Sequence, residues 1–329
     1  MKNSTIVILV SATILGGAAL LWWVFSKPLP DYSKLSDANT EHYWLSPDIN
    51  RLPDNDSGRL IRYGRDLVIN TAKYYGPKGS LIPNHINGMN CQNCHLDAGT
   101  KIYGNNLSGV MGIYPKYRDI LGREEGSVER VEDCFTRSLA GKRIDTNSHE
   151  MKAIIAYMTW LSSNLKKGEK PGGVNMRPIE LLDRAADPEK GKIVYINKCQ
   201  SCHQLDGQGM LAVDGITYQY PPLWGPHSYN IGASFYRIER FAAFVKDNMP
   251  FGTSFTAPQL SAEEAWDVAA YVNSQPHPFV DVKKDWPDMA SKPMDNPHGP
   301  YADTFSVLQH KYGPFAAIKA WKEQQKKKS

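Results

Sequence analysis

The chain of 329 residues is poor in cysteine, with five in all, and four of the five fall into two short runs. These runs are CQNCH at residues 91–95 and CQSCH at residues 199–203. Neither run is followed by a second ligand pair at the spacing of a zinc finger, which argues against a zinc site. A redox-active pair of cysteines would not need the histidine that follows. Two C-x-x-C-H runs are instead typical of the attachment of two c-type haems.

The spacing within each run has a chemical reason. Two thiols three positions apart can add to the two vinyl groups of one porphyrin, and the next histidine can place a nitrogen on the iron. The predicted cofactors are therefore two covalently attached c-type haems, each with its iron. The residues predicted to attach them and to supply the proximal iron ligands are Cys91, Cys94, His95, Cys199, Cys202 and His203.

A large excess of one charge is also absent, because 38 lysines and arginines face 34 aspartates and glutamates, giving a net charge of +4. Two haems would bring four propionates, about −4, and leave the loaded protein near neutrality. The charge therefore gives no reason to expect a nucleic acid partner. The basic end of the chain, KEQQKKKS, is typical of a solvated tail.

Only one long apolar run is present, at residues 4–25. A run of about 20 residues can cross the hydrocarbon core as a helix. A cleaved signal would need small residues beyond the apolar core, but the cluster at residues 16–19 lies inside it. We therefore predict an uncleaved membrane anchor at residues 1–27, on the periplasmic side of the bacterial inner membrane, where haem is attached to such motifs. A soluble periplasmic protein after signal cleavage is the alternative.

Beyond the anchor, one series of features occurs twice in the same order. Each copy has a helix that leads to the haem motif, a proline-containing loop and a closing amphipathic helix. We expect Ser261 with Glu264 to cap the closing helix of the second copy, and Asn147 with Glu150 that of the first. The proline loop of the second copy should accept the ring N–H of the proximal histidine. The segments are 58–76, 112–117 and 147–165 in the first copy, and 187–199, 219–226 and 261–275 in the second.

This order of motifs resembles a class I cytochrome c domain, and the second copy also has a Met-Pro pair at Met249. The resemblance implies an all-α fold with two class I cytochrome c domains in tandem behind an N-terminal transmembrane helix. It also makes Met249 the distal iron ligand of the second haem. A thioether is a soft, neutral ligand that raises the reduction potential of haem iron.

The first copy lacks the Met-Pro pair and has Cys134 at the corresponding place in the order of features. Val131, Phe135 and Leu139 form an apolar helical stripe, and Cys134 borders it. The order of features therefore predicts Cys134 as the distal iron ligand of the first haem. The alternative is that Cys134 is a small buried apolar residue, as free cysteines usually are.

Arginines surround this cysteine, and arginine clusters suit oxyanions. With both haem motifs, the stretches RVEDCFTRS and NMPFG resemble the dihaem thiosulfate dehydrogenase / tetrathionate reductase family. That family implies a reversible reaction in which two thiosulfates give tetrathionate and two electrons at the cysteine-ligated haem. Matching positions make Arg130 and Ser138 substrate contacts, and Arg123 is added from the preceding loop. Asn248 stands where some members carry a lysine, so no lysine–methionine ligand exchange is expected.

The resulting organisation places a His/Cys haem and the substrate site in residues 28–170, and a His/Met haem in residues 171–285. Residues 286–329 form a C-terminal extension. Electrons would leave through the His/Met haem to a periplasmic carrier, such as another c-type cytochrome, or to a membrane redox protein. The alternative function is a membrane-anchored dihaem electron-transfer cytochrome without its own substrate. A subunit that conjugates thiosulfate to a partner's cysteine is a further alternative.

Overall fold

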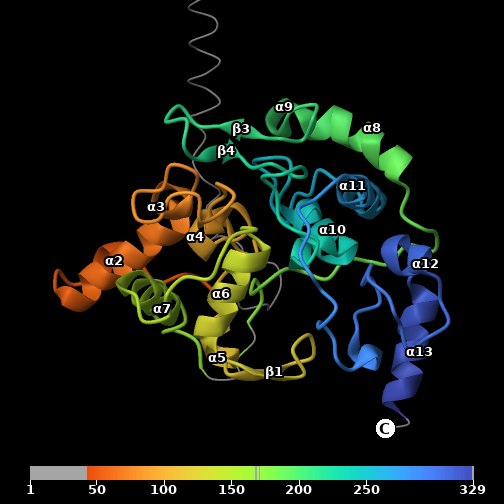
Figure 1. The fold of residues 1–329 in the computed structure, drawn as a ribbon, viewed down its shortest axis with the longest axis horizontal. Helices are drawn as coiled ribbons and strands as arrows, with labels where there is room; N and C mark the ends of the chain where they lie inside the picture. The colour runs from red at the N-terminus through yellow and green to blue at the C-terminus, as the bar shows by residue number, and fades with distance from the viewer. Residues whose placement is uncertain (1–42, 167–168, 170, 328–329) are drawn as a thin grey trace, which may run out of the picture. The chain divides into compact units, whose positions relative to one another are not determined.

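The computed structural model describes residues 43–166, 169 and 171–327 of the chain (Figure 1). These residues form a mostly helical structure, with two short hairpins that correct the all-α prediction. The predicted anchor at residues 1–27 lies outside the described residues. Among the residues described, no helix is both long enough and apolar enough to cross a bilayer.

The first repeat surrounds the first haem motif. In its hairpin, β1 and β2 run antiparallel, with Lys116 opposite Glu125. Its elements are η2 (Ile49–Arg51), α2 (Asp56–Ile69), α3 (Thr71–Tyr75), η3 (Cys91–Asn93), α4 (Leu96–Gly99), α5 (Val110–Ile113), β1 (Lys116–Arg118), β2 (Arg123–Glu125), α6 (Ser127–Arg137) and α7 (His149–Leu161).

The second repeat surrounds the second haem motif and has the same order of main helices. In its hairpin, β3 and β4 are antiparallel, with Met210 opposite Tyr220. Its elements are α8 (Pro188–Lys198), α9 (Gln200–His203), β3 (Met210–Leu211), β4 (Tyr218–Tyr220), η4 (Ser234–Tyr236), α10 (Ile238–Asn248) and α11 (Ala262–Ser274).

In each repeat the first and last long helices cross at a glycine. α2 packs against α7, and a Cβ atom built on Gly64 would lie 2.0 Å from the carbonyl oxygen of Ala153. α8 packs against α11, and a Cβ atom on Gly191 would lie 1.9 Å from the carbonyl oxygen of Asp267. Only a residue without a side chain allows two backbones to approach so closely. The repeat predicted from the order of motifs is thus confirmed by equivalent helix packing.

Two helix starts in the second repeat follow the sequence prediction. Asp187 caps α8 through its carboxylate, and Pro188 takes the first helical position, where its missing N–H costs nothing. Ser261 and Glu264 form a reciprocal capping box at the start of α11, as predicted.

The start of α7 is a correction to the prediction. Its cap is Ser148, whose hydroxyl accepts the N–H of Met151 at 3.1 Å. The predicted capping box of Asn147 and Glu150 is wrong, because Asn147 lies one residue too early. The Glu150 carboxylate instead accepts a hydrogen bond from the Tyr63 hydroxyl at 3.1 Å.

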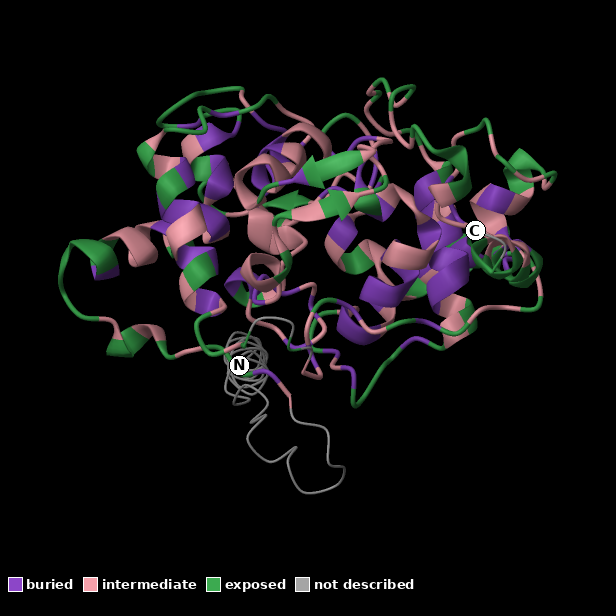
Figure 2. Ribbon diagram, turned by 90° about the horizontal axis from the view of Figure 1, so that it is seen from below, coloured by how far each residue is buried: buried purple, intermediate pink, exposed green. Residues whose placement is uncertain are grey.

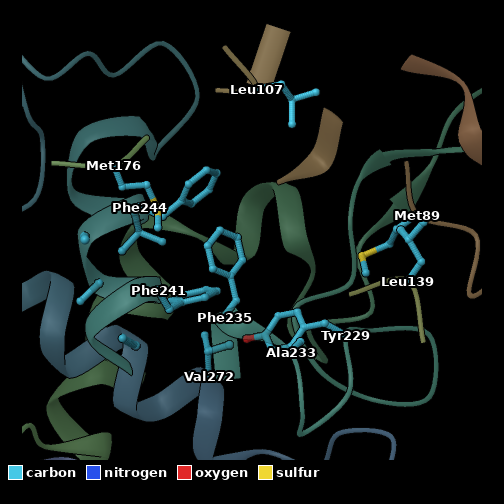
Figure 3. Close-up of a cluster of buried hydrophobic side chains, with 14 of the residues drawn as sticks. Met89, Leu107, Leu139, Met176, Tyr229, Ala233, Phe235, Phe241, Phe244 and Val272 are labelled. Atoms are coloured by element: carbon cyan, nitrogen blue, oxygen red, sulfur yellow. The ribbon is translucent and has the colours of Figure 1, made fainter. Parts of the chain in front are cut away.

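The core runs through both repeats. Buried residues lie on helix faces turned inward and in parts of the loops, while outer helix faces are exposed (Figure 2). One hydrophobic cluster includes residues of both repeats, and Figure 3 shows part of it. There the Phe235 ring lies 5.9 Å from that of Phe241 and 4.9 Å from that of Phe244. The two repeats therefore share one core within a unit that begins at residue 43.

Buried amides fasten the helix that carries Cys134 to the second repeat. The side-chain amide of Asn230 donates to the carbonyl of Thr136 in α6 at 2.8 Å. The amide of Asn87 donates to the carbonyl of Ser228 at 3.0 Å. The first bond ties α6 to the segment that precedes α10, and the second ties the loop before the first haem motif to the same segment.

The C-terminal extension packs against both repeats. The N–H of Trp286 donates to the carbonyl of Ile120, in the β1–β2 turn, at 2.9 Å. Arg237, the cap of α10, donates to Asp295 at 2.7 Å. The last helix continues to Lys326, so most of the predicted solvated tail is helical. The extension contains η5 (Met289–Ser291), α12 (Val307–Tyr312) and α13 (Ala316–Lys326).

Candidate active site

The first haem motif is held by polar contacts with the helix that precedes it. Thr71, at the start of α3, accepts the N–H of Cys91 at 3.0 Å, and its hydroxyl lies 3.2 Å from the Cys91 sulfur. The Asn90 side chain accepts the N–H of Ala72 at 2.8 Å. These contacts fix the start of the turn η3, which carries Cys91, against α3.

The two proximal histidines each have one ring nitrogen bonded to a backbone carbonyl. His203 Nδ1 lies 2.8 Å from the carbonyl of Pro221, which confirms the predicted role of the second proline loop. His95 Nδ1 lies 2.5 Å from the carbonyl of Asn105, which precedes the first proline loop at 112–117. In both repeats Nδ1 carries the proton and Nε2 is left for iron. Burial lowers the pKa of His95 to about 4, so the imidazole is neutral, as an iron ligand must be.

An apolar cavity lies beside the first haem motif and brings the predicted haem residues together. Cys91, Cys94 and His95 lie on it, and Cys134 lies on it too, from α6. Apart from these, its walls are mainly apolar, as a porphyrin ring requires. The apolar lining residues are Val68, Leu107, Val110, Val131, Phe135, Leu139, Ile154 and Met158. The residues present therefore fit a haem whose iron has a histidine and a cysteine within reach.

α6 presents Cys134 at the edge of its buried face. Val131, Phe135 and Leu139 are buried, as the stripe predicts, and Cys134 itself is half-buried. The helix begins after Gly126, without a side-chain cap. Burial raises the pKa of the Cys134 thiol, and the charge of Arg130 acts against this rise. Arg130 thus stabilises negative charge on the sulfur.

A polar cleft of about 310 Å³ adjoins this cavity. His95, Arg130 and Ser138 border both spaces, so they stand between the haem pocket and the open side. Arg130 and Ser138 are therefore brought together with Cys134, as the resemblance implies. The other cationic residues on the cleft are Lys116, Arg118, Arg137, Arg237, Arg240 and Lys292.

Carboxylates hold several of these cations in place. Asp133 accepts from Arg130 at 2.7 Å and from Arg137 at 2.7 Å. Arg137 also donates to Asp285 at 2.6 and 2.8 Å, which ties α6 to the segment that follows α11. These pairs fix the guanidinium groups and reduce the net positive charge that they offer to an anion.

Arg123 is not brought to the cleft. Its side chain is 55% exposed and donates to Glu129 at 3.0 Å. Arg118 is the arginine of this hairpin that reaches the cleft, where Glu125 lies 3.1 Å away. Arg118 and Arg123 are paired directly across the hairpin, so the register does not separate them; the Arg123 side chain instead turns to Glu129 in α6.

The second haem motif has a similar local arrangement. Met249 follows α10 directly as its C-terminal cap and packs against the core. The amide of Asn248 donates to the carbonyl of Tyr103 at 3.1 Å and to that of Phe244 at 3.0 Å. The residue before the predicted ligand is thus fixed from both repeats. Burial lowers the pKa of His203 and keeps its ring neutral.

Sequence reasoning missed the contribution of the second repeat and the C-terminal extension to the cleft. Arg237 and Arg240 come from the start of α10, and Lys292 and His298 come from the extension. No motif marks them, because they reach the first haem motif only through packing of distant segments.

Two C-x-x-C-H sites with carbonyl-bound histidines define a dihaem c-type cytochrome, and the comparisons with known proteins agree. Residues 83–166 match the family described as SoxA/TsdA, cytochrome c domain, and residues 188–276 match Cytochrome c. The protein therefore has two cytochrome c domains and carries two covalently attached c-type haems.

Relatives that match most of the chain identify the family more closely than the domain matches do. A thiosulfate dehydrogenase of Stutzerimonas stutzeri is 36% identical over 84% of this chain and 87% of its own length. One of Allochromatium vinosum is 36% identical over 69% of this chain and 82% of its own length. The chain belongs to the thiosulfate dehydrogenase family, and it is an oxidoreductase.

A solved structure supports the same relationship. Thiosulfate dehydrogenase (TsdBA) from Marichromatium purpuratum matches 76% of this chain with a TM-score of 0.66 and 29% identity. This chain spans about half of that longer one, 51% of its length.

Proposed function

We propose that this protein interconverts thiosulfate and tetrathionate at the first haem site. Two thiosulfate dianions join through a new bond between their sulfane sulfurs and release two electrons, and no proton is needed. The reverse reaction breaks that bond with two electrons. The observation that carries the proposal is the meeting of Cys134, Arg130 and Ser138 beside the first haem motif.

When bound, the haems supply one-electron redox chemistry, which a thiolate ligand and a thioether ligand tune in opposite directions. We propose Cys134 as the distal ligand on the first iron and Met249 as that on the second. Thiolate and thioether then poise the two irons differently, so that electrons pass from the substrate site toward the second domain.

The residues around Cys134 have separate tasks. Two dianions in a partly dry cleft repel one another by several kcal/mol at an effective dielectric constant of about 20. Arg130 offsets this repulsion and can hold a sulfonate with two parallel hydrogen bonds. Ser138, at the end of α6, can donate a hydrogen bond to a sulfonate oxygen. The apolar wall of Val131 and Phe135 keeps water from the sulfur atoms.

The cellular location is inferred from the haem motifs, because haem is attached to such motifs outside the cytoplasm. We propose that the protein acts there, either held to the membrane by residues 1–27 or released after cleavage in that segment. Electrons pass to a periplasmic cytochrome or a membrane redox protein. The proposed domains are residues 28–170 and 171–285, with the extension at 286–329 closing one side of the cleft.

The proposal is tested by the substitution Cys134→Ala. We expect turnover of thiosulfate with an artificial electron acceptor to be abolished, while haem content stays at two per chain, because other cysteines hold the haems. Thr136→Ala is a matched control on α6, since its hydroxyl only bonds the carbonyl of Asp133 at 3.2 Å.

Normal turnover in Cys134→Ala would remove the cysteine from the reaction. A wild-type protein that exchanges electrons but does not turn over thiosulfate would instead be a dihaem carrier without its own substrate.

A further inference from the structure

The cationic residues of the cleft divide into two groups by their partners. Arg130 and Arg137 share Asp133, and Arg237 is paired with Asp295. Their charge is therefore partly cancelled before any anion enters. Arg118 is likewise 3.1 Å from Glu125.

Arg240, Lys116 and Lys292 belong to the second group, since none of them forms an ion pair with a carboxylate within the part of the chain that the structure describes. The ammonium group of Lys292 already donates to the carbonyls of His298 and Pro300, at 2.9 and 2.7 Å. Lys116 lies over the ring of Tyr114, 5.3 Å from its centre. Arg240 projects from the first turns of α10, in the second domain, and Lys116 from β1, in the first domain. The cleft therefore receives one such cation from each domain, and neither cation is tied to a carboxylate by an ion pair.

Electrostatic contacts place these two cations near one another and near Arg130. The charge of Arg240 lowers the pKa of Lys116, after burial and the charges of Arg118 and Arg130. Burial lowers the pKa of Arg240, the charges of Arg237 and Arg130 add to the effect, and the charges of Glu239 and Asp295 oppose it. A half-buried guanidinium that is not ion-paired is stabilised when an anion reaches it.

Arg240 also differs from Arg130 in position. Arg130 borders both the apolar cavity and the cleft, whereas Arg240 borders only the cleft. It therefore lies on the side away from the haem pocket. An anion that met Arg130 at one end could meet Arg240 at the other.

We propose that Arg240, together with Lys116, forms a second oxyanion subsite, which binds the far sulfonate of tetrathionate or of the second thiosulfate. This inference rests on the proposed function. The first sulfonate lies at Arg130 and Ser138, next to Cys134. The second domain then contributes directly to the substrate site. Arg130 of the first domain binds one end of the tetrathionate dianion, and Arg240 of the second domain binds the other end. A guanidinium suits this task because it can bind a sulfonate in two parallel hydrogen bonds.

The test is the binding of tetrathionate to the oxidised holoprotein, measured by titration calorimetry. No reductant is present, so binding is measured without turnover. Arg240→Gln should raise the dissociation constant about tenfold or more, as expected for the loss of a charge-assisted hydrogen bond. Arg240→Lys should recover part of the affinity, because lysine keeps the charge and loses the fork. Lys246→Gln removes a positive charge at the far end of α10, outside the cleft, and should bind as wild type does.

A haem propionate is the competing partner for Arg240, and the reduction potentials distinguish it. If Arg240 neutralised a propionate, Arg240→Gln would lower the potential of one haem and leave tetrathionate affinity unchanged. That result would overturn the subsite. Unchanged affinity and unchanged potentials would overturn it as well.

The outcomes also separate this inference from the proposed function. Wild-type protein that neither binds tetrathionate nor turns over thiosulfate would overturn the function and the subsite together. Wild-type protein that does both, with Arg240→Gln and Arg240→Lys binding equally well, would overturn only the subsite. Haem content and circular dichroism of each variant establish that it is folded.

Discussion

Arg130 joins the two halves of the site, because it borders both the haem pocket and the cleft. Negative charge on the Cys134 sulfur is the largest influence on Arg130 and raises the pKa of its guanidinium. Arg130 is therefore always positively charged. We predict that Arg130→Ala raises KM for thiosulfate and lowers kcat, with haem spectra intact. Arg130→Lys should recover only part of kcat/KM, since lysine lacks the paired donors. Steady-state kinetics on the holoprotein check this.

Two companion variants sharpen that comparison. Ser138→Ala should cost about 1 kcal/mol in kcat/KM, the value of one neutral donor. Arg123→Ala should change kcat/KM by less than about twofold, because exposed ion pairs such as that with Glu129 contribute little. If Arg130→Ala had the same KM and kcat as wild type, Arg130 would not bind the first sulfonate. Arg118 or Arg137 would then be the residue that binds it.

Residues close together in sequence could be predicted, and residues brought together by packing could not. The spacing of Cys91, Cys94 and His95 is set by porphyrin chemistry, so the motif alone reveals it. Arg130 and Cys134 lie one helical turn apart, so a resemblance over nine residues can carry both. Arg240 has no such neighbour, and its place at the cleft depends on how α10 packs.

At the scale of elements, helix crossing explains the glycine that precedes each haem motif. Gly191 lies in α8 where a Cβ atom would meet the carbonyl oxygen of Asp267 at 1.9 Å. We predict that Gly191→Ala lowers the free energy of unfolding by roughly 1–3 kcal/mol, because the backbones must move apart. Chemical denaturation of the holoprotein, followed by far-ultraviolet circular dichroism, measures this.

Gly112→Ala is the matched control. Gly112 lies in α5, and a Cβ atom there would have no atom within 4 Å. Its free energy of unfolding should stay within about 0.5 kcal/mol of wild type. Equal stability of Gly191→Ala and wild type would mean that the close crossing of α8 and α11 is not needed.

The elements also show where sequence patterns reach their limit. The helices α2, α7, α8 and α11 were predicted because apolar spacing and caps are local signals, whereas α10 and α13 were not. The hairpin β1–β2 was not, because its strands are three residues each and give little local signal. Of its two paired arginines, Arg118 borders the cleft while Arg123 pairs with Glu129, and neither outcome could be predicted from the sequence.

At the scale of the whole molecule, two copies of one domain have diverged to different tasks. The first domain has Cys134 on its apolar cavity and a cationic cleft beside it. The second has Met249 at the end of α10, fixed through Asn248 by a carbonyl of the first domain. Arg137 in α6 and Asp285, at the end of the second domain, join the two domains. In the proposed scheme one domain holds the substrate, while the other helps to build its site and passes electrons on.

This division predicts that the two irons differ in ligand and in reduction potential. Thiolate ligation stabilises ferric iron, while thioether ligation raises the potential. Electron paramagnetic resonance of the oxidised protein should show a low-spin thiolate-ligated haem beside a His/Met haem, and a redox titration should show two separate steps. Met249→Ala should lower only the higher of the two reduction potentials and slow electron transfer to an acceptor, while tetrathionate still binds. Two His/Met signals in the resonance spectrum would contradict the assignment of Cys134 as a distal ligand. A redox titration with one reduction step, whose potential does not change in Met249→Ala, would contradict the assignment of both Cys134 and Met249. Such a result would leave the cationic cleft without a thiolate-poised iron to receive its electrons.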